Sequence, residues 1–329
     1  MIRFGVIGTN WITEAFIEGA KQHPEFELAG VYSRTEERAR EFATKYQVES
    51  IFTDLHMMAS SIVIDAVYIA SPTSLHAKQA IIFLEQEKHV LCEKPIASNA
   101  AELRAMIEAA KKHNVVLMEA LKSTFVPNFK VISENVDKVG KVRRYFANYC
   151  QYSSRYDAYK EGNILNAFKP EFSNGALMDI GIYCLYPLVV LFGKPDEVKA
   201  TGILLDTGVD GSGSIVLNYP DMDAVVMFSK ITDSAIPSEI QGEKGNLVFD
   251  KINVPEKVEI RYRNGELEDL TVPQKPQSMY YELEEFITLI QQGQLESKVN
   301  SLDHSLAVME IIDECRQQVG VVFPADQHI

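Results

Sequence analysis

The sequence predicts an α/β protein with an N-terminal doubly wound parallel sheet, followed by an α+β domain built on a large, open, mainly antiparallel sheet. Up to about residue 121, short apolar runs alternate with amphipathic helical patterns, which is typical of parallel strands connected by helices. Beyond that point the alternation stops, and strand-like runs separated by turn residues take over. The 329 residues leave room for two domains of roughly 100–200 residues each, which we place at 1–121 and 122–329.

Six strands and five helices are expected in the first domain. The strands are Ile2–Ile7, Phe26–Tyr32, Ser50–Phe52, Ala66–Ala70, Val90–Cys92 and Val115–Met118. The helices are Trp11–Lys21, Glu36–Tyr46, Leu55–Ser60, Leu75–Glu87 and Ala100–His113. Strands joined by helical crossovers in this way match a doubly wound sheet with two mononucleotide-binding halves.

Composition limits the classes of function. Asp and Glu outnumber Lys and Arg by 46 to 32, a formal net charge of −14, whereas a nucleic-acid surface needs clustered basic residues. The longest apolar run, Ile182 to Phe192, contains Pro187 and is shorter than the roughly 20 residues that span a bilayer. The four cysteines and seven histidines are dispersed, without metal-ligand spacing. We therefore expect a soluble cytoplasmic protein that binds no nucleic acid, membrane or metal.

The first predicted strand runs into a turn that resembles a dinucleotide-binding fingerprint. Gly8 holds the first glycine position, whereas Asn10 and Thr13 stand at the second and third. Asn tolerates left-handed backbone angles better than most residues. An ordinary tight turn is the alternative, but this turn opens a helix whose N-terminal amides would face a pyrophosphate. We therefore predict a Rossmann dinucleotide-binding domain. The expected cofactor contacts in the turn are Gly8, Thr9, Asn10, Trp11 and Ile12.

The second predicted strand ends at Ser33-Arg34, where an NAD-selective site would carry Asp or Glu for the ribose hydroxyls. A hydroxyl and a guanidinium here indicate NADP, because Ser33, Arg34 and Arg38 could hold its 2′-phosphate by charge-assisted hydrogen bonds. The alternative is that residues 33–35 only cap the next helix, with acidic residues in its first turn complementing the helix dipole. We expect NADP to be preferred over NAD.

Two later strands also end in polar residues. His76 starts the helix after the fourth strand, and Lys94 follows the fifth. Taken alone, His76 would be a helix-start residue bonded to nearby backbone. In open α/β sheets, however, ligands bind at the carboxyl ends of the strands, and a lysine beside a rigid proline at this edge is placed for hydride-transfer chemistry. The expected cofactor contacts at these strand ends are Ser71, Pro72, His76, Glu93, Lys94 and Pro95.

Taken together, these motifs resemble those of the glucose-fructose oxidoreductase/inositol dehydrogenase (Gfo/Idh/MocA) family, and the resemblance extends over essentially the whole chain. The motifs are Gly8-Thr9-Asn10-Trp11-Ile12, Ala70-Ser71-Pro72 with His76, and Glu93-Lys94-Pro95. The resemblance implies that Lys94 is the catalytic or near-catalytic residue and that Pro95 follows a cis bond that aims it. A cis X-Pro bond is a tight, fixed turn that can present a side chain at a strand end.

Residues 173–184, Ser-Asn-Gly-Ala-Leu-Met-Asp-Ile-Gly-Ile-Tyr-Cys, resemble the second signature of that family. Asp179 and Tyr183 are four residues apart, so both project from one helical face. Tyr183 stands where most members of the family have histidine. The dihydrodiol dehydrogenase-like members of the family also have tyrosine there. Alternatively, Asp179 only caps or solvates the helix and Tyr183 packs in the core. Because Lys94 is also present, we favour catalytic roles for both.

From Glu197 to Val272 the chain reads as successive strands separated by turn residues. Several strands alternate polar and apolar residues, which predicts one buried and one more polar face. A large open sheet needs something to cover its remaining apolar surface, and the resembling family dimerises sheet to sheet. We therefore assign dinucleotide binding to 1–121, and substrate binding and dimerisation, as a homodimer or higher homo-oligomer, to 122–329.

The predicted reaction is hydride transfer between NADP or NAD and a secondary alcohol or its ketone, within a sugar, cyclitol, nucleotide-sugar or trans-dihydrodiol. The alkoxide that forms on reduction must be protonated. Tyr183 could donate this proton, with the Lys94 ammonium favouring its phenolate and Asp179 orienting one or both; Lys94 could equally be the donor. The alternatives are a non-catalytic NAD(P)-sensing regulator on the same fold and an NAD-dependent glycosidase.

Overall fold

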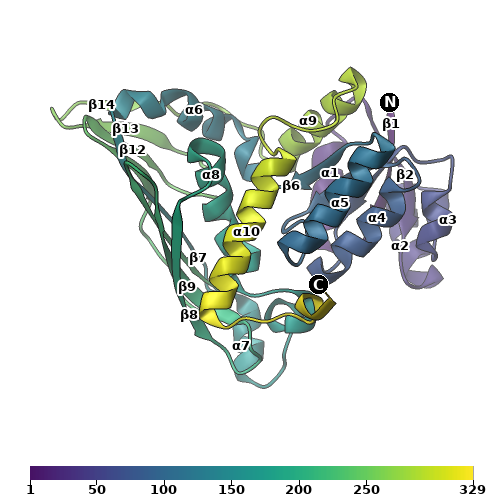
Figure 1. Ribbon diagram of the computed structural model, residues 1–329. Helices are drawn as coiled ribbons and strands as arrows, with labels where there is room; N and C mark the ends of the chain where they lie inside the picture. The colour runs from purple at the N-terminus through teal and green to yellow at the C-terminus, as the bar shows by residue number, and fades with distance from the viewer. Residues whose placement is uncertain (329) are drawn as a thin grey trace. The chain divides into compact units, whose positions relative to one another are not determined.

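The computed structural model describes residues 1–328, which form two compact units (Figure 1). Unit 1 comprises Met1–Leu121 together with Lys275–Ser305. Unit 2 comprises Lys122–Gln274 and the chain from Leu306 onwards. Each unit contains one sheet, so the two sheets that the sequence predicts lie in separate compact bodies.

Residues 275–305 belong to unit 1 because they contain α9 (Met279–Gln292), which packs against α1 (Trp11–Ala20). The ring of Phe286 on α9 lies 5.9 Å from that of Phe4 on the first strand. The sequence placed this segment with the second domain. Helical periodicity predicts that a face is buried, but it does not say which body buries it.

The sheet of unit 1 has six parallel strands in the order β3-β2-β1-β4-β5-β6, which confirms the doubly wound Rossmann topology. The strands are β1 (Ile2–Ile7), β2 (Phe26–Tyr32), β3 (Ser50–Phe52), β4 (Ala66–Ile69), β5 (His89–Glu93) and β6 (Leu117–Ala120). The strand order reverses between β1 and β4, where ligands bind in such sheets. β6 ends two residues later than predicted, because Glu93 on β5 pairs with Ala120.

Four helices of unit 1 begin at a side chain that accepts a backbone hydrogen bond. Unit 1 as a whole contains the helices α1, α2 (Glu36–Tyr46), α3 (Leu55–Ala59), α4 (His76–Leu84), α5 (Ala100–His113) and α9. The capping residues are Asn10, Thr35, Asp54 and Asn99, for α1, α2, α3 and α5 respectively. Each cap of this kind contributes about 1 kcal/mol, which explains why these helix starts could be read from the sequence.

Unit 2 contains an eight-stranded sheet in the order β14-β13-β12-β11-β7-β10-β9-β8. The strands are β7 (Val142–Cys150), β8 (Glu197–Leu204), β9 (Asp210–Asn218), β10 (Asp223–Ser229), β11 (Ser238–Gly242), β12 (Gly245–Phe249), β13 (Val258–Tyr262) and β14 (Leu267–Asp269). Only β7 and β10 pair in parallel within this sheet of the described chain. The prediction of a large, mainly antiparallel sheet is therefore confirmed.

The helices of unit 2 include a long apolar one that forms part of its core. They are α6 (Pro127–Asn135), α7 (Ser154–Lys160), α8 (Ile182–Phe192), preceded by a π-helical turn (Leu177–Gly181), and α10 (Leu302–Val319), which begins in unit 1. The segment Pro170–Phe192 is long and apolar enough to cross a membrane, but 72% of its most apolar window is buried inside the protein. It is therefore a core helix of a soluble protein.

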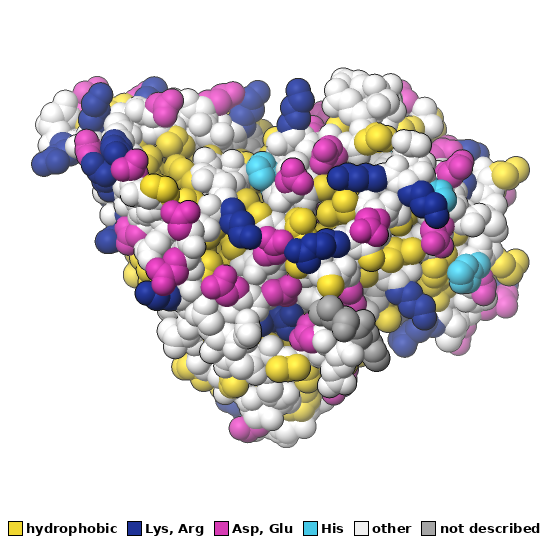
Figure 2. All heavy atoms as spheres, viewed as in Figure 1, with side chains coloured by type: hydrophobic (Ala, Val, Ile, Leu, Met, Phe, Trp, Pro, Cys, Tyr) yellow, Lys and Arg dark blue, Asp and Glu magenta, His cyan; other side chains and the backbone are white. Residues whose placement is uncertain are grey.

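The surface carries charges of both signs. On the face drawn in Figure 2, basic and acidic side chains are interspersed with each other and with apolar ones. Charged side chains on the surface of the protein also pair, for example Arg40 with Glu36 one helical turn away. Exposed pairs of this kind each contribute only about 0–1 kcal/mol, so they add little to stability.

β6 also carries a buried carboxyl group, Glu119, which is 1% exposed. Its Oε1 accepts a hydrogen bond from the Ile96 N–H at 3.0 Å. Burial raises the pKa of Glu119 from its ordinary 4.5 to about 7, although hydrogen bonds from Ser305 and Ile96 act to lower it. The folded protein therefore holds this proton more tightly than the unfolded chain does. The resulting stabilisation is complete below the unfolded pKa and is lost as the pH rises through the folded one.

We expect Glu119→Gln to remove this contribution, because glutamine can still accept the Ile96 hydrogen bond but cannot ionise. The loss of unfolding free energy between pH 4.5 and pH 8 should be smaller than in the wild type by about 3 kcal/mol. Chemical denaturation at the two pH values measures it. Glu108→Gln, at an exposed acid on α5, is the matched control. An unchanged pH dependence in Glu119→Gln would show that this carboxyl does not hold the proton.

Candidate active site

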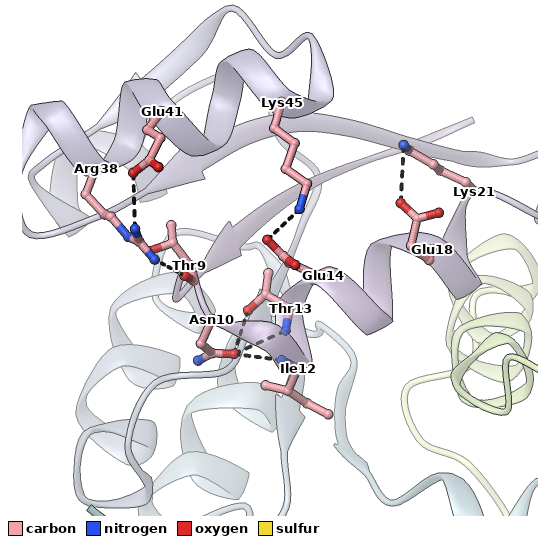
Figure 3. Close-up of polar contacts among 10 residues, drawn as sticks. All are labelled: Thr9, Asn10, Ile12, Thr13, Glu14, Glu18, Lys21, Arg38, Glu41 and Lys45. Atoms are coloured by element: carbon pink, nitrogen blue, oxygen red, sulfur yellow. Dashed lines mark hydrogen bonds and ion pairs between the residues drawn. The ribbon is translucent and has the colours of Figure 1, made fainter.

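The turn between β1 and α1 is tied to the end of β4. Gly8 has φ +103°, and a Cβ there would lie 2.6 Å from the carbonyl oxygen of Ala70, so only glycine fits. Asn10 donates a hydrogen bond from Nδ2 to the same oxygen at 2.8 Å, and its Oδ1 accepts from the N–H groups of Ile12 and Thr13 (Figure 3). Asn10 at the second fingerprint position therefore caps the helix and fixes the turn. The neighbouring Trp11 is 67% exposed.

Arg38 reaches from α2 to the same turn. Its Nε donates to Thr9 Oγ1 at 3.2 Å and its Nη2 donates to the Thr9 carbonyl oxygen at 3.0 Å, while Nη1 pairs with Glu41 (Figure 3). The three guanidinium nitrogens of Arg38 are thus all engaged, two with Thr9 and one with Glu41. Arg38 therefore braces the turn.

The end of β2 leaves Arg34 at the surface. The Ser33 N–H donates to the carbonyl oxygen of Phe52 at 3.1 Å, and the Arg34 side chain is exposed. The cap of α2 is Thr35, whose Oγ1 accepts from the Arg38 N–H. Of residues 33–35, which the sequence alternatively offered as a helix cap, Thr35 caps α2. The side chains of Ser33 and Arg34 do not contribute to this cap.

His76 joins the loops that follow β4 and β5. It is 1% exposed, with Nε2 2.8 Å from the carbonyl oxygen of Ser71 and Nδ1 2.9 Å from that of Pro95. Burial lowers the pKa of His76. The Ser71 hydroxyl in turn donates to Gln79 at 2.7 Å. His76 thus contacts nearby backbone, which is the alternative that the sequence offered for it, and through these contacts it joins the loops that follow β4 and β5.

The loop after β5 contains the cis Lys94-Pro95 bond that the family resemblance implies. Glu93 is 7% exposed; its Oε1 accepts from Tyr68 Oη at 2.5 Å, and its Oε2 accepts from the Lys94 N–H at 3.2 Å. Two residues later, the Ile96 N–H donates to Glu119. Among residues 90–100, all of them described by the structure, Lys94 alone is not buried. The loop thus presents one side chain outward from an otherwise buried segment.

Unit 2 contributes the second predicted pair. Asp179 lies in the π-helical turn, and Tyr183 lies in the first turn of α8. The ring of Tyr183 meets that of Tyr149 edge-on, with centroids 5.6 Å apart. Asp179 Oδ2 forms an ion pair with Lys230 Nζ. The alternative in which Asp179 only caps or solvates its helix is therefore not what the structure shows.

Two residues that sequence analysis did not single out hold this helix start. Lys230 follows β10 and is 4% exposed. Asp210 is 3% exposed, and its Oδ2 accepts from the Leu177 N–H at 2.6 Å. Burial raises the pKa of Asp210 to about 6, against the hydrogen bond from Leu177 and the charge of Lys230. Gly175 has φ +145°, and a Cβ there would collide with the Asp210 carboxylate. That glycine was the only local sequence signal of this arrangement.

The predicted residues thus form two groups, one in each unit. In unit 1, hydrogen bonds run from Arg38 through the turn to the end of β4, and the two ring nitrogens of His76 contact the carbonyl oxygens of Ser71 and Pro95. Ser33 and Arg34 are not part of this chain of bonds. In unit 2, Asp179 and Tyr183 share one helical segment with Lys230 beside it. Among the side chains that the structure describes, residues 1–327, no cluster of three His, Cys, Asp or Glu is arranged to hold a metal ion.

Comparison with known proteins places these motifs in a family. Residues 2–121 match the model of an oxidoreductase family with an NAD-binding Rossmann fold, GFO/IDH/MocA, and residues 135–248 match the GFO/IDH/MocA C-terminal domain. The chain is 56% identical to scyllo-inositol 2-dehydrogenase (NADP(+)) IolU of Bacillus subtilis, over 99% of this chain and 100% of that protein. It is 29% identical to trans-1,2-dihydrobenzene-1,2-diol dehydrogenase of Mus musculus, over 99% of each.

A solved structure has the same fold. The 3-ketoreductase KijD10 of Actinomadura kijaniata, in complex with NADP and TDP-benzene, superposes with a TM-score of 0.83 at 22% identity, over 97% of this chain and 98% of that one. The fold, both family matches and the 56% identity over nearly the whole chain agree. The protein is therefore a member of the Gfo/Idh/MocA family of NAD(P)-dependent oxidoreductases.

Proposed function

We propose that the protein is an NADP-dependent dehydrogenase that oxidises a secondary alcohol of a cyclitol, scyllo-inositol or a close analogue, and reduces the corresponding ketone. The observation that carries the proposal is the presentation of Lys94. It is the one side chain of residues 90–100 that is not buried, at a strand end where open α/β sheets bind ligands. The relative named scyllo-inositol 2-dehydrogenase, at 56% identity, supports a cyclitol over the dihydrodiol named for the 29%-identical relative.

The cofactor fits the turn after β1. The close approach of Gly8 to β4 leaves a backbone cradle that a Cβ would fill, and residues 8–12 open α1, whose dipole favours the pyrophosphate. Arg38 is engaged with Thr9 and Glu41, so exposed Arg34, with Ser33, is the better partner for a 2′-phosphate. Ser71, Pro72, His76 and the Glu93-Lys94-Pro95 loop complete the contacts. NADP supplies the hydride acceptor or donor.

The chemistry left to the protein is proton transfer. Oxidation of the alcohol removes a hydride from carbon and a proton from the hydroxyl, and reduction reverses both. We assign the proton to Tyr183 or Lys94, with Asp179 orienting its partner. Both side chains, a phenol and an ammonium, can exchange one proton with a substrate oxygen.

The open face of the unit 2 sheet supports a homodimer. Figure 1 shows α8 and α10 on one face of this sheet, and within residues 1–328 no helix covers the other. On that face, Val216, Val225 and Phe146 are cross-strand neighbours on β9, β10 and β7, and none of them is buried. A second copy would cover this apolar row. Three of the four free cysteines are buried, in keeping with a cytoplasmic enzyme whose thiols stay reduced.

The substrate is tested by nicotinamide absorbance with NADP and a panel of scyllo-inositol, myo-inositol, glucose and a trans-dihydrodiol. We expect scyllo-inositol to have the highest kcat/KM. Lys94→Met and Tyr183→Phe should each lower kcat about 10²-fold or more, the usual contribution of a general acid or base. Lys78→Met, at an exposed lysine on α4, is the control. Turnover of none of the four would contradict the substrate class, and near-normal kcat in both variants would contradict the catalytic assignment.

Arg34→Ala should weaken NADP binding far more than NAD binding. Loss of a charge-assisted contact to the 2′-phosphate predicts a rise of about 10- to 100-fold in KM for NADP, with KM for NAD nearly unchanged. The matched control is Arg40→Ala, which removes an exposed arginine on α2 whose guanidinium pairs with Glu36. Equal effects of Arg34→Ala on both cofactors would sink the phosphate assignment.

Light scattering at micromolar concentration should give twice the mass of the chain. Val225→Asp would place a charge in the middle of the apolar row, so we expect this variant to be a monomer with an unchanged circular dichroism spectrum. A monomeric wild type would refute the dimer.

A further inference from the structure

Lys230 is a buried cation that has no role in the reaction proposed for the protein. Its side chain is 5% exposed and forms an ion pair with Asp179, and its Nζ lies 5.6 Å from the centroid of the Phe168 ring. The backbone is fixed on both sides: the Lys230 N–H donates to Gly211 at 2.9 Å, and its carbonyl oxygen accepts from Ser153 at 2.9 Å. A buried ammonium is costly unless it is paired, so the arrangement holds Nζ against one carboxylate.

Within this ion pair, the Asp179 side chain is partly exposed to solvent, whereas the Lys230 side chain is buried. The Asp179 side chain is 31% exposed, against 5% for Lys230. Asp179 also lies in a π-helical turn, a local feature that is frequent at functional sites. The buried ammonium of Lys230 therefore holds the carboxylate of Asp179, which remains partly accessible to solvent.

A second carboxylate shares the field of this lysine. Asp210 is buried, caps the N-terminus of the helix that carries Asp179, and has its pKa lowered by the charge of Lys230 against the raising effect of burial. Lys230 thus pairs with Asp179 and favours the ionised form of Asp210, which accepts the Leu177 N–H at the start of this helix. Its own burial leaves it little access to a substrate.

We propose that Lys230 is a positioning residue of the hydride-transfer site, which keeps the Asp179 carboxylate ionised and in one orientation beside Tyr183. Asp179 then presents a fixed hydrogen-bond acceptor to a substrate hydroxyl or to the group that carries the proton. This inference rests on the proposed function. It assigns to Lys230 an effect on turnover that passes through Asp179 and is distinct from cofactor binding.

The test is a double-mutant cycle in kcat and KM, with Lys230→Met, Asp179→Asn and both together. We expect Lys230→Met to lower kcat at least tenfold with KM for NADP nearly unchanged, and Lys230→Arg to recover part of the loss. In the Asp179→Asn background, Lys230→Met should change kcat less than twofold, because the group through which it acts is already neutral. Multiplicative effects, or wild-type kcat in Lys230→Met, would overturn the proposal.

Lys160→Met is the matched control. Lys160 also pairs with an aspartate, Asp157, and lies over aromatic rings, but its side chain is 52% exposed. We expect wild-type kinetics from it. If Lys230→Met does not fold, Lys230→Gln replaces it in the cycle.

If the wild type turns over no panel member, the proposed function fails by itself, and the same cycle is then measured in thermal unfolding. Strictly additive changes in Tm there would overturn the Lys230–Asp179 coupling independently of any substrate.

Discussion

The need to satisfy buried backbone groups governs the loop after β5. Residues 95–100 are all buried, and a buried N–H or carbonyl without a partner costs free energy comparable to a lost hydrogen bond. The partners come from other elements: His76 from α4 contacts the Pro95 carbonyl oxygen, and Glu119 from β6 accepts from Ile96. With its neighbours held in this way, Lys94 is directed outward. The partial exposure of Lys94 is therefore a consequence of how the loop's backbone is bonded.

In unit 2, ionisable side chains hold the segment that carries the predicted site residues. The helix that carries Asp179 and Tyr183 begins at a carboxylate, Asp210, and is flanked by a buried ammonium, Lys230. Neither group is exposed enough to meet a substrate readily. Functional side chains need surrounding groups that fix their geometry, and the groups that hold this helix start, Asp210 and Lys230, are ionisable. Asp179 is thus held by an ion pair with a lysine that is buried behind it.

The weak dinucleotide fingerprint also has a structural explanation. Glycine at the second position usually lets the backbone approach the pyrophosphate closely, and Asn10 lacks that advantage. Its side chain instead caps α1 and bonds to the end of β4, while Arg38 braces Thr9 from the other side. The turn is thus held by side-chain hydrogen bonds. A motif that matches poorly letter by letter can still build the required turn.

These cases separate what the sequence could and could not predict. The Rossmann strands, the helix starts and the residues at the strand ends follow from local periodicity and capping residues, and the structure places them within a few residues of prediction. Lys230 is 51 residues from Asp179, and Asp210 is 33 residues from Leu177. No local pattern relates residues so far apart. Their pairing depends on which strands become neighbours in the unit 2 sheet, including the parallel pair β7 and β10. A lone lysine after a strand carries no sign of its partner, so the groups that orient a site emerge only once the sheet order is known.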